Sequence, residues 1–184
     1  LPWPKRIVKV ASYDCASTMM LKELAENFEH VYISTGATFD EEITKTATLM
    51  QAAGRTFSLL HCVTSYPNTM EMCNLRRMEW LKQFTPSVGW SDHTLVKRDG
   101  LKASKAAIAL GADVIERHFT ILPEDKTKDG PVSITPAMLK ELKEFSQLDQ
   151  KKQRQRIQKE IPDWEVILGE ETRELTPTEL LNRD

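Results

Sequence analysis

The sequence lacks several features that would point to a membrane or a nucleic acid. No apolar run in its 184 residues approaches the roughly 20 residues of a membrane-spanning helix. The formal net charge is only -2, so the chain has no strong field of one sign that would gather a polyanion or an anionic bilayer. Neither a membrane nor a nucleic-acid partner is therefore expected.

Cysteine is scarce as well. The three cysteines are Cys15, Cys62 and Cys73, and no two of them form a CxxC pair. An odd number of cysteines without this spacing argues against a disulfide framework and against a zinc knuckle. Reduced thiols, and with them a cytoplasmic location, are expected.

What the sequence does have is a repeated alternation of apolar strands and amphipathic helices. Five short, β-branched apolar segments fit buried parallel strands. They span residues 7–12, 30–35, 57–62, 87–93 and 113–118. The segments between them carry apolar side chains at the helical period. This order predicts an α/β fold with a parallel sheet built from right-handed crossovers.

Two parallel architectures fit this repeat, an open doubly wound sheet and a (β/α)8 TIM barrel. No glycine-rich phosphate loop follows any of the predicted strands, which weakens the nucleotide-binding open sheet. Polar residues stand instead at the C-terminal end of every strand, where barrel enzymes keep their chemistry. Five units are too few to close a barrel, which typically needs ~250 residues. Residues 1–147 are therefore predicted to be the later part of a TIM barrel.

The pattern changes in residues 148–184. The stretch QLDQKKQRQRIQKEI is polar with a basic bias and predicts a peripheral helix or a linker. The remaining tail, WEVILGEETRELTPTELLNRD, is expected to hold one strand-like piece and a short helix capped by Thr176 or Thr178. This segment is interpreted as separate from the barrel repeat.

Two of the four histidines end successive predicted strands. His93 and His118 would lie on neighbouring strands, which are ~4.8 Å apart, so both imidazoles could reach one metal ion. Two nitrogens, with waters and a carboxylate, make an open site that polarises a carbonyl or activates water. The alternative is a pair of core histidines without a ligand, and two histidines alone identify no metal. His30 is interpreted as structural. For His61, a structural role in the core is at least as good an interpretation as a functional role.

A lysine and four hydroxyl residues form a second candidate group. Lys9 interrupts the first apolar strand, where a charge is costly unless it meets an anion. Four hydroxyl residues stand at equivalent C-terminal ends of the predicted strands: Ser12, Ser34, Thr64 and Ser91. Together the five could surround a phosphate, with help from backbone N–H groups at helix starts. The alternative is that each hydroxyl only caps a helix.

Several motifs together resemble the sialic acid (N-acetylneuraminate) synthase family, whose members condense phosphoenolpyruvate with an N-acylated amino sugar. The motifs are KVASYD (9–14), ISTGATFDEEI (33–43), LHCVTSYPNT (60–69), VGWSDHT (88–94), ALGADVIERHFTI (109–121) and KDGPVSITP (128–136). The resemblance covers about residues 5–147. It implies that the five strands are the fourth to the eighth of the barrel, and that residues 148–184 lead toward a C-terminal antifreeze-like domain that is absent here.

The resemblance also implies roles for individual residues. His93 and His118 would hold a divalent metal ion, Mn2+ or Mg2+, and Asp14 would be the catalytic carboxylate that manages proton transfer to or from its water. Tyr66 and Asp129 would contact the amino sugar. Contacts to phosphoenolpyruvate are implied for a further group: Lys9, Ser12, Ser34, Thr64 and Ser91.

The implied reaction is a transfer that forms a carbon–carbon bond. Phosphoenolpyruvate would attack the aldehyde of a sugar such as N-acetylmannosamine, water would add, and phosphate would leave, giving a sialic-acid-like nonulosonate for surface polysaccharide. The intact protein is expected to be a homodimer. Two departures, Tyr13 in place of a small residue and the order Asp129-Gly130-Pro131, leave the sugar open. The alternatives are another metal-dependent barrel lyase or phosphoenolpyruvate-condensing synthase, or an inactive fragment without the N-terminal strands.

Overall fold

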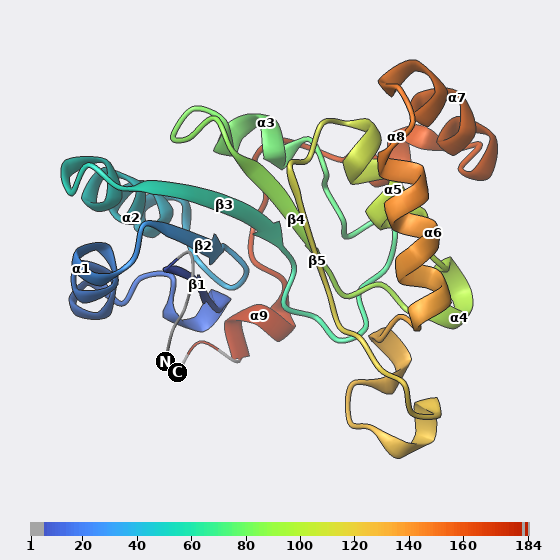
Figure 1. Ribbon diagram of the computed structural model, residues 1–184, viewed down its shortest axis with the longest axis horizontal. Helices are drawn as coiled ribbons and strands as arrows, with labels where there is room; N and C mark the ends of the chain where they lie inside the picture. Colours follow the sequence, from blue (N-terminus) through green and yellow to red (C-terminus); the bar gives the residue numbers. More distant parts are fainter. Residues whose placement is uncertain (1–5, 182, 184) are drawn as a thin grey trace.

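Five parallel strands form one sheet in a computed structural model of the protein, which describes residues 6–181 and 183 (Figure 1). The strands are β1 (Ile7–Val10), β2 (His30–Ser34), β3 (Thr56–Cys62), β4 (Val88–Asp92) and β5 (Val114–Arg117). They lie side by side in chain order, and every neighbouring pair is parallel. The five predicted strands are thus confirmed, each to within two residues at either end.

Helices connect and cover the strands. The helices between strands are α1 (Thr18–Asn27), α2 (Asp40–Ala52), α3 (Arg77–Leu81), α4 (Val96–Asp99) and α5 (Lys102–Ala109). Three short 3-10 helices are η1 (Ser12–Asp14), η2 (Glu124–Lys126) and η3 (Gly130–Val132). The chain continues through α6 (Pro136–Ser146), α7 (Gln150–Glu160), α8 (Trp164–Leu168) and α9 (Pro177–Leu181).

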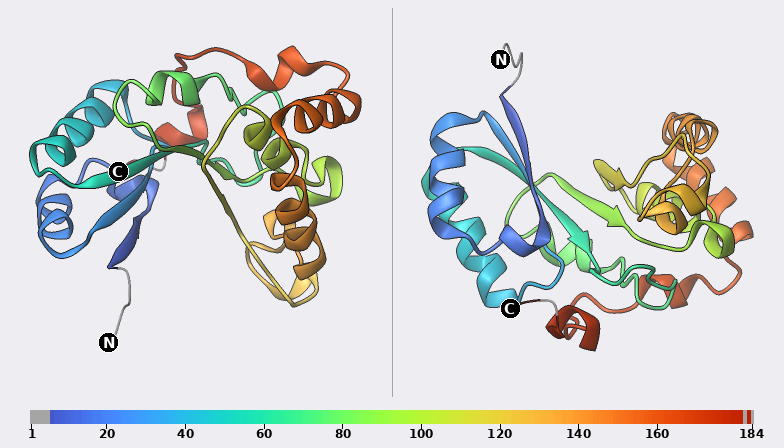
Figure 2. Two further views of the ribbon diagram at one scale, coloured as in Figure 1. Left: turned by 45° about the horizontal axis from the view of Figure 1, so that its top comes forward. Right: turned by 90° about the horizontal axis from the view of Figure 1, so that it is seen from below.

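The sheet curls, with helices on its convex side (Figure 2). Most strand side chains that point to the helices are apolar and buried, among them Ile33, Leu59 and Trp90. Their neighbours along each strand point to the concave side, because successive side chains of a strand alternate between its two faces. The architecture is the predicted α/β one, consistent with an incomplete TIM barrel, and the numbering of its strands as fourth to eighth stays a prediction.

Two edges of the curled sheet are open. Within the described residues, β1 pairs only with β2, and β5 pairs only with β4. A free edge exposes unpaired backbone N–H and C=O groups, which is a liability in an isolated protein. The concave side between the two edges is therefore accessible from the direction in which a closed barrel would continue.

Residues 148–181 form three helices that pack on the rest of the chain. The predicted peripheral helix is confirmed as α7, whose Ile157 is fully buried where α7 packs on α5. The predicted strand-like piece is wrong, because Trp164–Leu168 forms α8, which buries Ile167 and meets the turn before α3 rather than a sheet edge. The predicted capping of a short helix is confirmed, since the N–H of Glu179 donates to the Thr176 hydroxyl at 3.2 Å.

No helix within the described part of the chain is both long enough and apolar enough to cross a membrane.

Candidate active site

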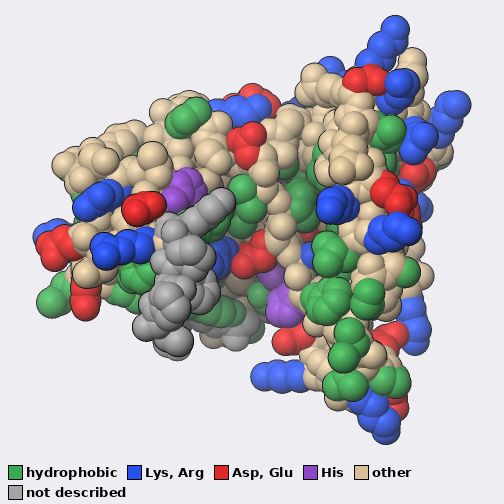
Figure 3. Space-filling model, in the orientation of Figure 1, with side chains coloured by type: hydrophobic (Ala, Val, Ile, Leu, Met, Phe, Trp, Pro, Cys, Tyr) green, Lys and Arg blue, Asp and Glu red, His purple; other side chains and the backbone are tan. Residues whose placement is uncertain are grey.

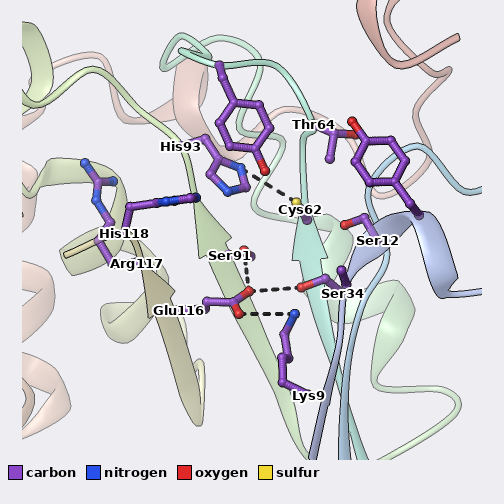
Figure 4. Close-up of a pocket in the computed structure, with 13 residues that line it drawn as sticks. Lys9, Ser12, Ser34, Cys62, Thr64, Ser91, His93, Glu116, Arg117 and His118 are labelled. Atoms are coloured by element: carbon purple, nitrogen blue, oxygen red, sulfur yellow. Dashed lines mark hydrogen bonds and ion pairs between the residues drawn. The ribbon is translucent and has the colours of Figure 1, made fainter. Parts of the chain in front are cut away.

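A pocket of about 350 Å³ lies where the C-terminal ends of the strands meet (Figure 4). Its volume falls near the lower end of the roughly 300–1,000 Å³ that is typical of small-molecule sites. Eight of the ten residues singled out from the sequence line it: Lys9, Ser12, Ser34, Thr64, Tyr66, Ser91, His93 and His118. The two others, Asp14 and Asp129, are not among its lining residues.

Strand alternation explains why these side chains converge. Ser91 and His93 are two residues apart at the end of β4, and Glu116 and His118 are two residues apart at the end of β5. Residues two apart in a strand share a face. Because Ser91 is the direct partner of Glu116 in the parallel register, the two strands present the same layers to the pocket.

Glu116 is the centre of the polar side of the pocket (Figure 4). The ammonium of Lys9 lies 3.1 Å from its Oε1, and the hydroxyls of Ser91 and Ser34 donate to its Oε2 at 2.6 and 3.1 Å. The predicted anion-binding lysine and serines therefore do converge on an anion, and that anion is a carboxylate of the chain itself.

The ionisation of Glu116 follows from these contacts. Burial by itself would raise its pKa, but the hydrogen bond from Ser91, the charge of Lys9 and the hydrogen bond from Ser34 outweigh burial and lower it below the ordinary value. Glu116 is thus an anion at neutral pH. Lys9 compensates that charge, so the local pair is close to neutral before any ligand enters.

The two predicted metal-binding histidines lie side by side, with ring centroids 5.3 Å apart. His93 is buried, and its Nδ1–H donates to the carbonyl of Val63 at 3.2 Å, which leaves Nε2 with a free lone pair. Burial lowers the pKa of His93 to about 4, against the opposing effect of that hydrogen bond. His93 is therefore neutral at physiological pH, the state in which imidazole binds a metal.

The two histidines could fill two of the ligand positions around one divalent ion. No group of three or more His, Cys, Asp or Glu side chains within the described residues is arranged to hold a metal. His93 and His118 would supply two nitrogens, and the remaining positions would belong to water or to a substrate oxygen, as in an open catalytic site. A structural site, which is normally closed by four protein ligands, does not fit.

The side predicted to contact a sugar is built by loops. The ring of Tyr66 stacks 4.0 Å from His93 and lies 5.8 Å from His118, so it covers both imidazoles. Asp129, just before η3, places its Oδ2 3.7 Å from Nδ1 of His118. Asp129 is therefore next to the pocket through His118, although it does not line the pocket itself.

Close backbone approach shapes the floor of the pocket. The N–H of Gly36 donates to the hydroxyl of Ser12 at 3.1 Å. A Cβ at Gly36 would lie 2.9 Å from Sγ of Cys62 and 3.1 Å from a methyl carbon of Thr64. Gly36 is thus required for space, because any side chain would push into three lining residues, Ser12, Cys62 and Thr64.

Two further predicted residues have unexpected surroundings. Asp14 lies in η1 with an exposed side chain, and its proposed part in proton transfer stays a prediction. The hydroxyl and backbone N–H of Thr64 both donate to Glu179, at 3.3 and 3.1 Å. Thr64 therefore reaches the pocket while it is tied to the C-terminal tail.

Sequence reasoning missed residues that the structure brings into the site. Glu116 had a detectable signal, since it lies two positions before His118 in a predicted strand and must share its face. Arg117 also lines the pocket, and it forms an ion pair with Asp92 that is almost fully buried. The one sequence signal for that pair is that Asp92 and Arg117, which carry opposite charges, each directly precede one of the two histidines.

Comparison with known proteins identifies the family. The sequence profile of the NeuB family matches residues 4–156, most of the chain. The chain belongs to the NeuB family. The resemblance to sialic acid synthases is thereby confirmed, since curated relatives of this NeuB chain are named as sialic, legionaminic and pseudaminic acid synthases.

Two curated relatives illustrate the similarity. The N,N'-diacetyllegionaminic acid synthase of Campylobacter jejuni is 38% identical over 144 residues, which cover 74% of this chain and 41% of that protein. The N-acetylneuraminate-9-phosphate synthase of Drosophila melanogaster is 34% identical over 138 residues, 73% of this chain and 36% of that protein. The NeuB chain therefore spans well under half the length of these relatives.

Solved structures agree with the fold. The spore coat polysaccharide biosynthesis protein SpsE of Bacillus subtilis superposes with a TM-score of 0.77 at 28% identity, covering 94% of this chain and 48% of that one. The N-acetylneuraminic acid synthetase of Leptospira borgpetersenii superposes with a TM-score of 0.67 at 29% identity, covering 95% and 55% of the two chains. Both matches thus extend over nearly all of this NeuB chain.

Proposed function

We propose that this chain carries the phosphoenolpyruvate-binding and metal-binding part of a nonulosonate synthase active site. The observation that supports the proposal is the convergence of Lys9, two serines and two histidines in one pocket of a NeuB family chain. An ammonium and hydroxyl donors suit a phosphate and a carboxylate, and paired imidazoles suit a divalent ion. Both halves of this chemistry are needed by one reaction.

That reaction joins phosphoenolpyruvate to an N-acylated amino sugar such as N-acetylmannosamine. The methylene carbon of phosphoenolpyruvate forms a bond to the aldehyde carbon of the sugar, and water adds to the adjacent carbon. Phosphate then leaves with its bridging oxygen. The product is a sialic-acid-like nonulosonate, which we assign to surface polysaccharide biosynthesis in the cytoplasm.

The polar side of the pocket would bind the anion. Lys9, Ser34 and Ser91 are already oriented by Glu116, so a phosphate or carboxylate would take over donors that need little rearrangement. Ser12 and Thr64 would add contacts at the ends of the neighbouring strands. We propose Asp14, which lies outside the lining of the pocket, for proton transfer, and Glu116 is a carboxylate that does line the pocket.

The other side would hold the metal and the sugar. His93 and His118 would bind Mn2+ or Mg2+, which when bound supplies Lewis acidity toward a carbonyl oxygen and a template for two substrates. Tyr66 packs against His93 on this side of the pocket, with the two ring centroids 4.0 Å apart. Tyr66 and Asp129 are proposed to contact the amino sugar.

We propose that catalytic turnover requires a protein with a complete barrel, and that this protein is a homodimer. The five described strands leave two open edges, and the catalytic groups of a closed barrel come from several strands around its rim. The alternative that the 184-residue chain alone is inactive is favoured by those open edges. Binding of ligands at the pocket and catalytic turnover are therefore separate questions.

Phosphate release tests the function. It would be measured with phosphoenolpyruvate and N-acetylmannosamine, with and without Mn2+, and with mannose as a matched aldose that lacks the acetamido group. Release only with N-acetylmannosamine and Mn2+ is expected from the barrel, and calorimetric binding of phosphoenolpyruvate is expected from the chain alone. Release with mannose alone would instead indicate another phosphoenolpyruvate-condensing synthase, and absence of phosphoenolpyruvate binding would contradict the proposal.

A further inference from the structure

The C-terminal tail brings a buried carboxylate up to the pocket from behind. Glu179, on α9, is fully buried, and Figure 1 shows α9 near the ends of β1 and β2. Its Oε1 accepts hydrogen bonds from the backbone N–H groups of Ala37 and Thr64, at 3.0 and 3.1 Å, and from the Thr64 hydroxyl. Ala37 follows β2 and Thr64 follows β3, so one carboxylate joins the two loops.

An arginine of the tail completes this contact. Arg173 donates to both carboxylate oxygens of Glu179 at 2.7 Å, and to the carbonyl of Cys62 at 3.1 Å. Burial would raise the pKa of Glu179, but Arg173 and the N–H groups of Thr176 and Ala37 hold it at about 2. A buried ion pair is most favourable when its remaining polar atoms are satisfied. Both oxygens of this carboxylate accept several hydrogen bonds, whereas Nε of Arg173 is buried without a partner among the described residues.

The loop after β2 needs such support. Ala37 has a φ of 49°, a left-handed conformation that is uncommon for a residue with a Cβ. Its N–H is held by Glu179, and its carbonyl accepts from Arg183 at 2.6 Å. The preceding residue, Gly36, donates to Ser12, so the conformation of this loop sets the position of a hydroxyl that lines the pocket.

We infer that Glu179 is a positioning residue of the pocket, which fixes the loops after β2 and β3 and thereby the orientation of Ser12 and Thr64 toward a bound anion. The inference rests on the proposed function for the identity of that anion, phosphoenolpyruvate. It goes beyond that function in making residues 173–179 part of the binding machinery, since none of them lines the pocket. Glu179 acts only through other residues.

The test compares Glu179→Gln with Glu165→Gln in the full chain. Glu165 is a matched control because it forms an exposed ion pair with Arg76, and neither residue lines the pocket. Two quantities are measured: amide hydrogen exchange in the loops that contain Ala37 and Thr64, and the calorimetric Kd for phosphoenolpyruvate. In Glu179→Gln we expect at least tenfold faster exchange in both loops and a Kd raised about tenfold, with neither change in the control.

Thr64→Val separates positioning from general stability. If Glu179 acts through Thr64, Glu179→Gln should raise the Kd less in the Thr64→Val background than in the unchanged chain, because the two changes remove one shared contact. Arg173→Lys, which keeps the charge but loses the paired hydrogen bonds, should move exchange and Kd in the same direction by a smaller factor. That variant decides the question if Glu179→Gln does not fold.

Unchanged loop exchange in Glu179→Gln would overturn the inference. So would faster exchange with an unchanged Kd, because the loops would then move without consequence for the ligand. If the unchanged chain binds no phosphoenolpyruvate, the proposed function fails, and loop exchange alone then decides whether Glu179 fixes the two loops.

Discussion

The imidazoles of His93 and His118 are suited to share an ion because both come from strand ends and one is held neutral by burial. Replacing either with alanine should weaken Mn2+ binding by more than the roughly 10- to 100-fold that loss of an outer-shell partner costs, since each change removes one of two protein ligands. Free Mn2+ measured by electron paramagnetic resonance gives the affinity. His30→Ala is the control, because His30 bonds Thr56 and Ser58 at the other end of the sheet.

The control variant and the two pocket-histidine variants are expected to differ in Mn2+ affinity. His30→Ala should keep the affinity of the unchanged chain, while its stability falls slightly. Equal Mn2+ affinity in His93→Ala and the unchanged chain would remove the metal assignment. The same result in His118→Ala alone would reduce the site to a single histidine.

Glu116 competes with any anion for Lys9, Ser34 and Ser91. Changing Glu116 to glutamine removes a negative charge that would lie next to a bound phosphate and repel it, and because the Glu116 side chain is 39% exposed, solvent screens this repulsion to about 1 kcal/mol. We therefore expect inorganic phosphate to bind several-fold more tightly to Glu116→Gln, measured by calorimetry at fixed ionic strength. Unchanged or weaker binding would show that Glu116 orients the donors more than it repels the ligand.

At the scale of elements, β4 and β5 are joined by more than backbone hydrogen bonds. Asp92 and Arg117 are partners in the register, and their ion pair is buried on the side of the sheet that faces α5. Each precedes a pocket histidine by one residue. The pair therefore fixes the relative position of the two strand ends from which His93 and His118 project.

Breaking this pair should be costly. Asp92→Asn leaves the Arg117 charge buried without its partner, so we expect a loss of about 3–5 kcal/mol in the free energy of unfolding. Urea denaturation measures that loss. Lys82→Ala, at the exposed Glu79–Lys82 pair, is the control and should change stability by less than about 1 kcal/mol. A loss in Asp92→Asn no larger than in this control would contradict the structural role of the pair.

For the whole molecule, the open edge at β5 adjoins an apolar surface. Phe119, Ile121, Leu122 and Leu139 are each at least half exposed. Figure 3 shows hydrophobic side chains gathered beside α6 and the loop that precedes it. Exposed apolar patches next to an unpaired strand are typical of surfaces that bind another polypeptide.

We expect the 184-residue chain to associate with itself in a concentration-dependent manner, as measured by size-exclusion chromatography with light scattering. Leu139→Glu should shift the distribution toward monomer, because a charge in the patch must be desolvated on association. Met19→Glu is the matched control, since Met19 is 86% exposed on α1, away from β5. Equal association in both variants would exclude the patch as the contact surface.

Much of the fold could be predicted because its signals are local. Each strand is a short apolar run, and a polar residue at each C-terminal end indicates where the pocket lies. The contacts of Glu179 could not be predicted in the same way, because Thr64 is 115 residues away and no local pattern connects them. The prediction of a strand in the tail is wrong for a related reason, because a short apolar-rich run such as Trp164–Leu168 suits a strand or a helix, and this run forms α8.

The candidate site shows the same limit. Residue types at strand ends predicted which side chains converge, and eight of ten line the pocket. The sequence could not show that Glu116 already pairs with Lys9, Ser34 and Ser91. Which side chain lies between them depends on how the neighbouring strands align in the sheet. Asp14 shows that closeness in sequence to a strand end does not place a side chain in the pocket. Ser12 and Asp14 both lie in η1, but only Ser12 lines the pocket.

The division of the pocket between strands and loops has a consequence for engineering. Lys9, Ser34 and Ser91 project from the sheet itself, whereas Tyr66 and Asp129 lie in connecting segments. Loops tolerate substitution and insertion far better than the strands that support them. A library restricted to the loops around Tyr66 and Asp129 would therefore vary the residues proposed to contact the sugar and leave unchanged the strand residues proposed to bind phosphoenolpyruvate.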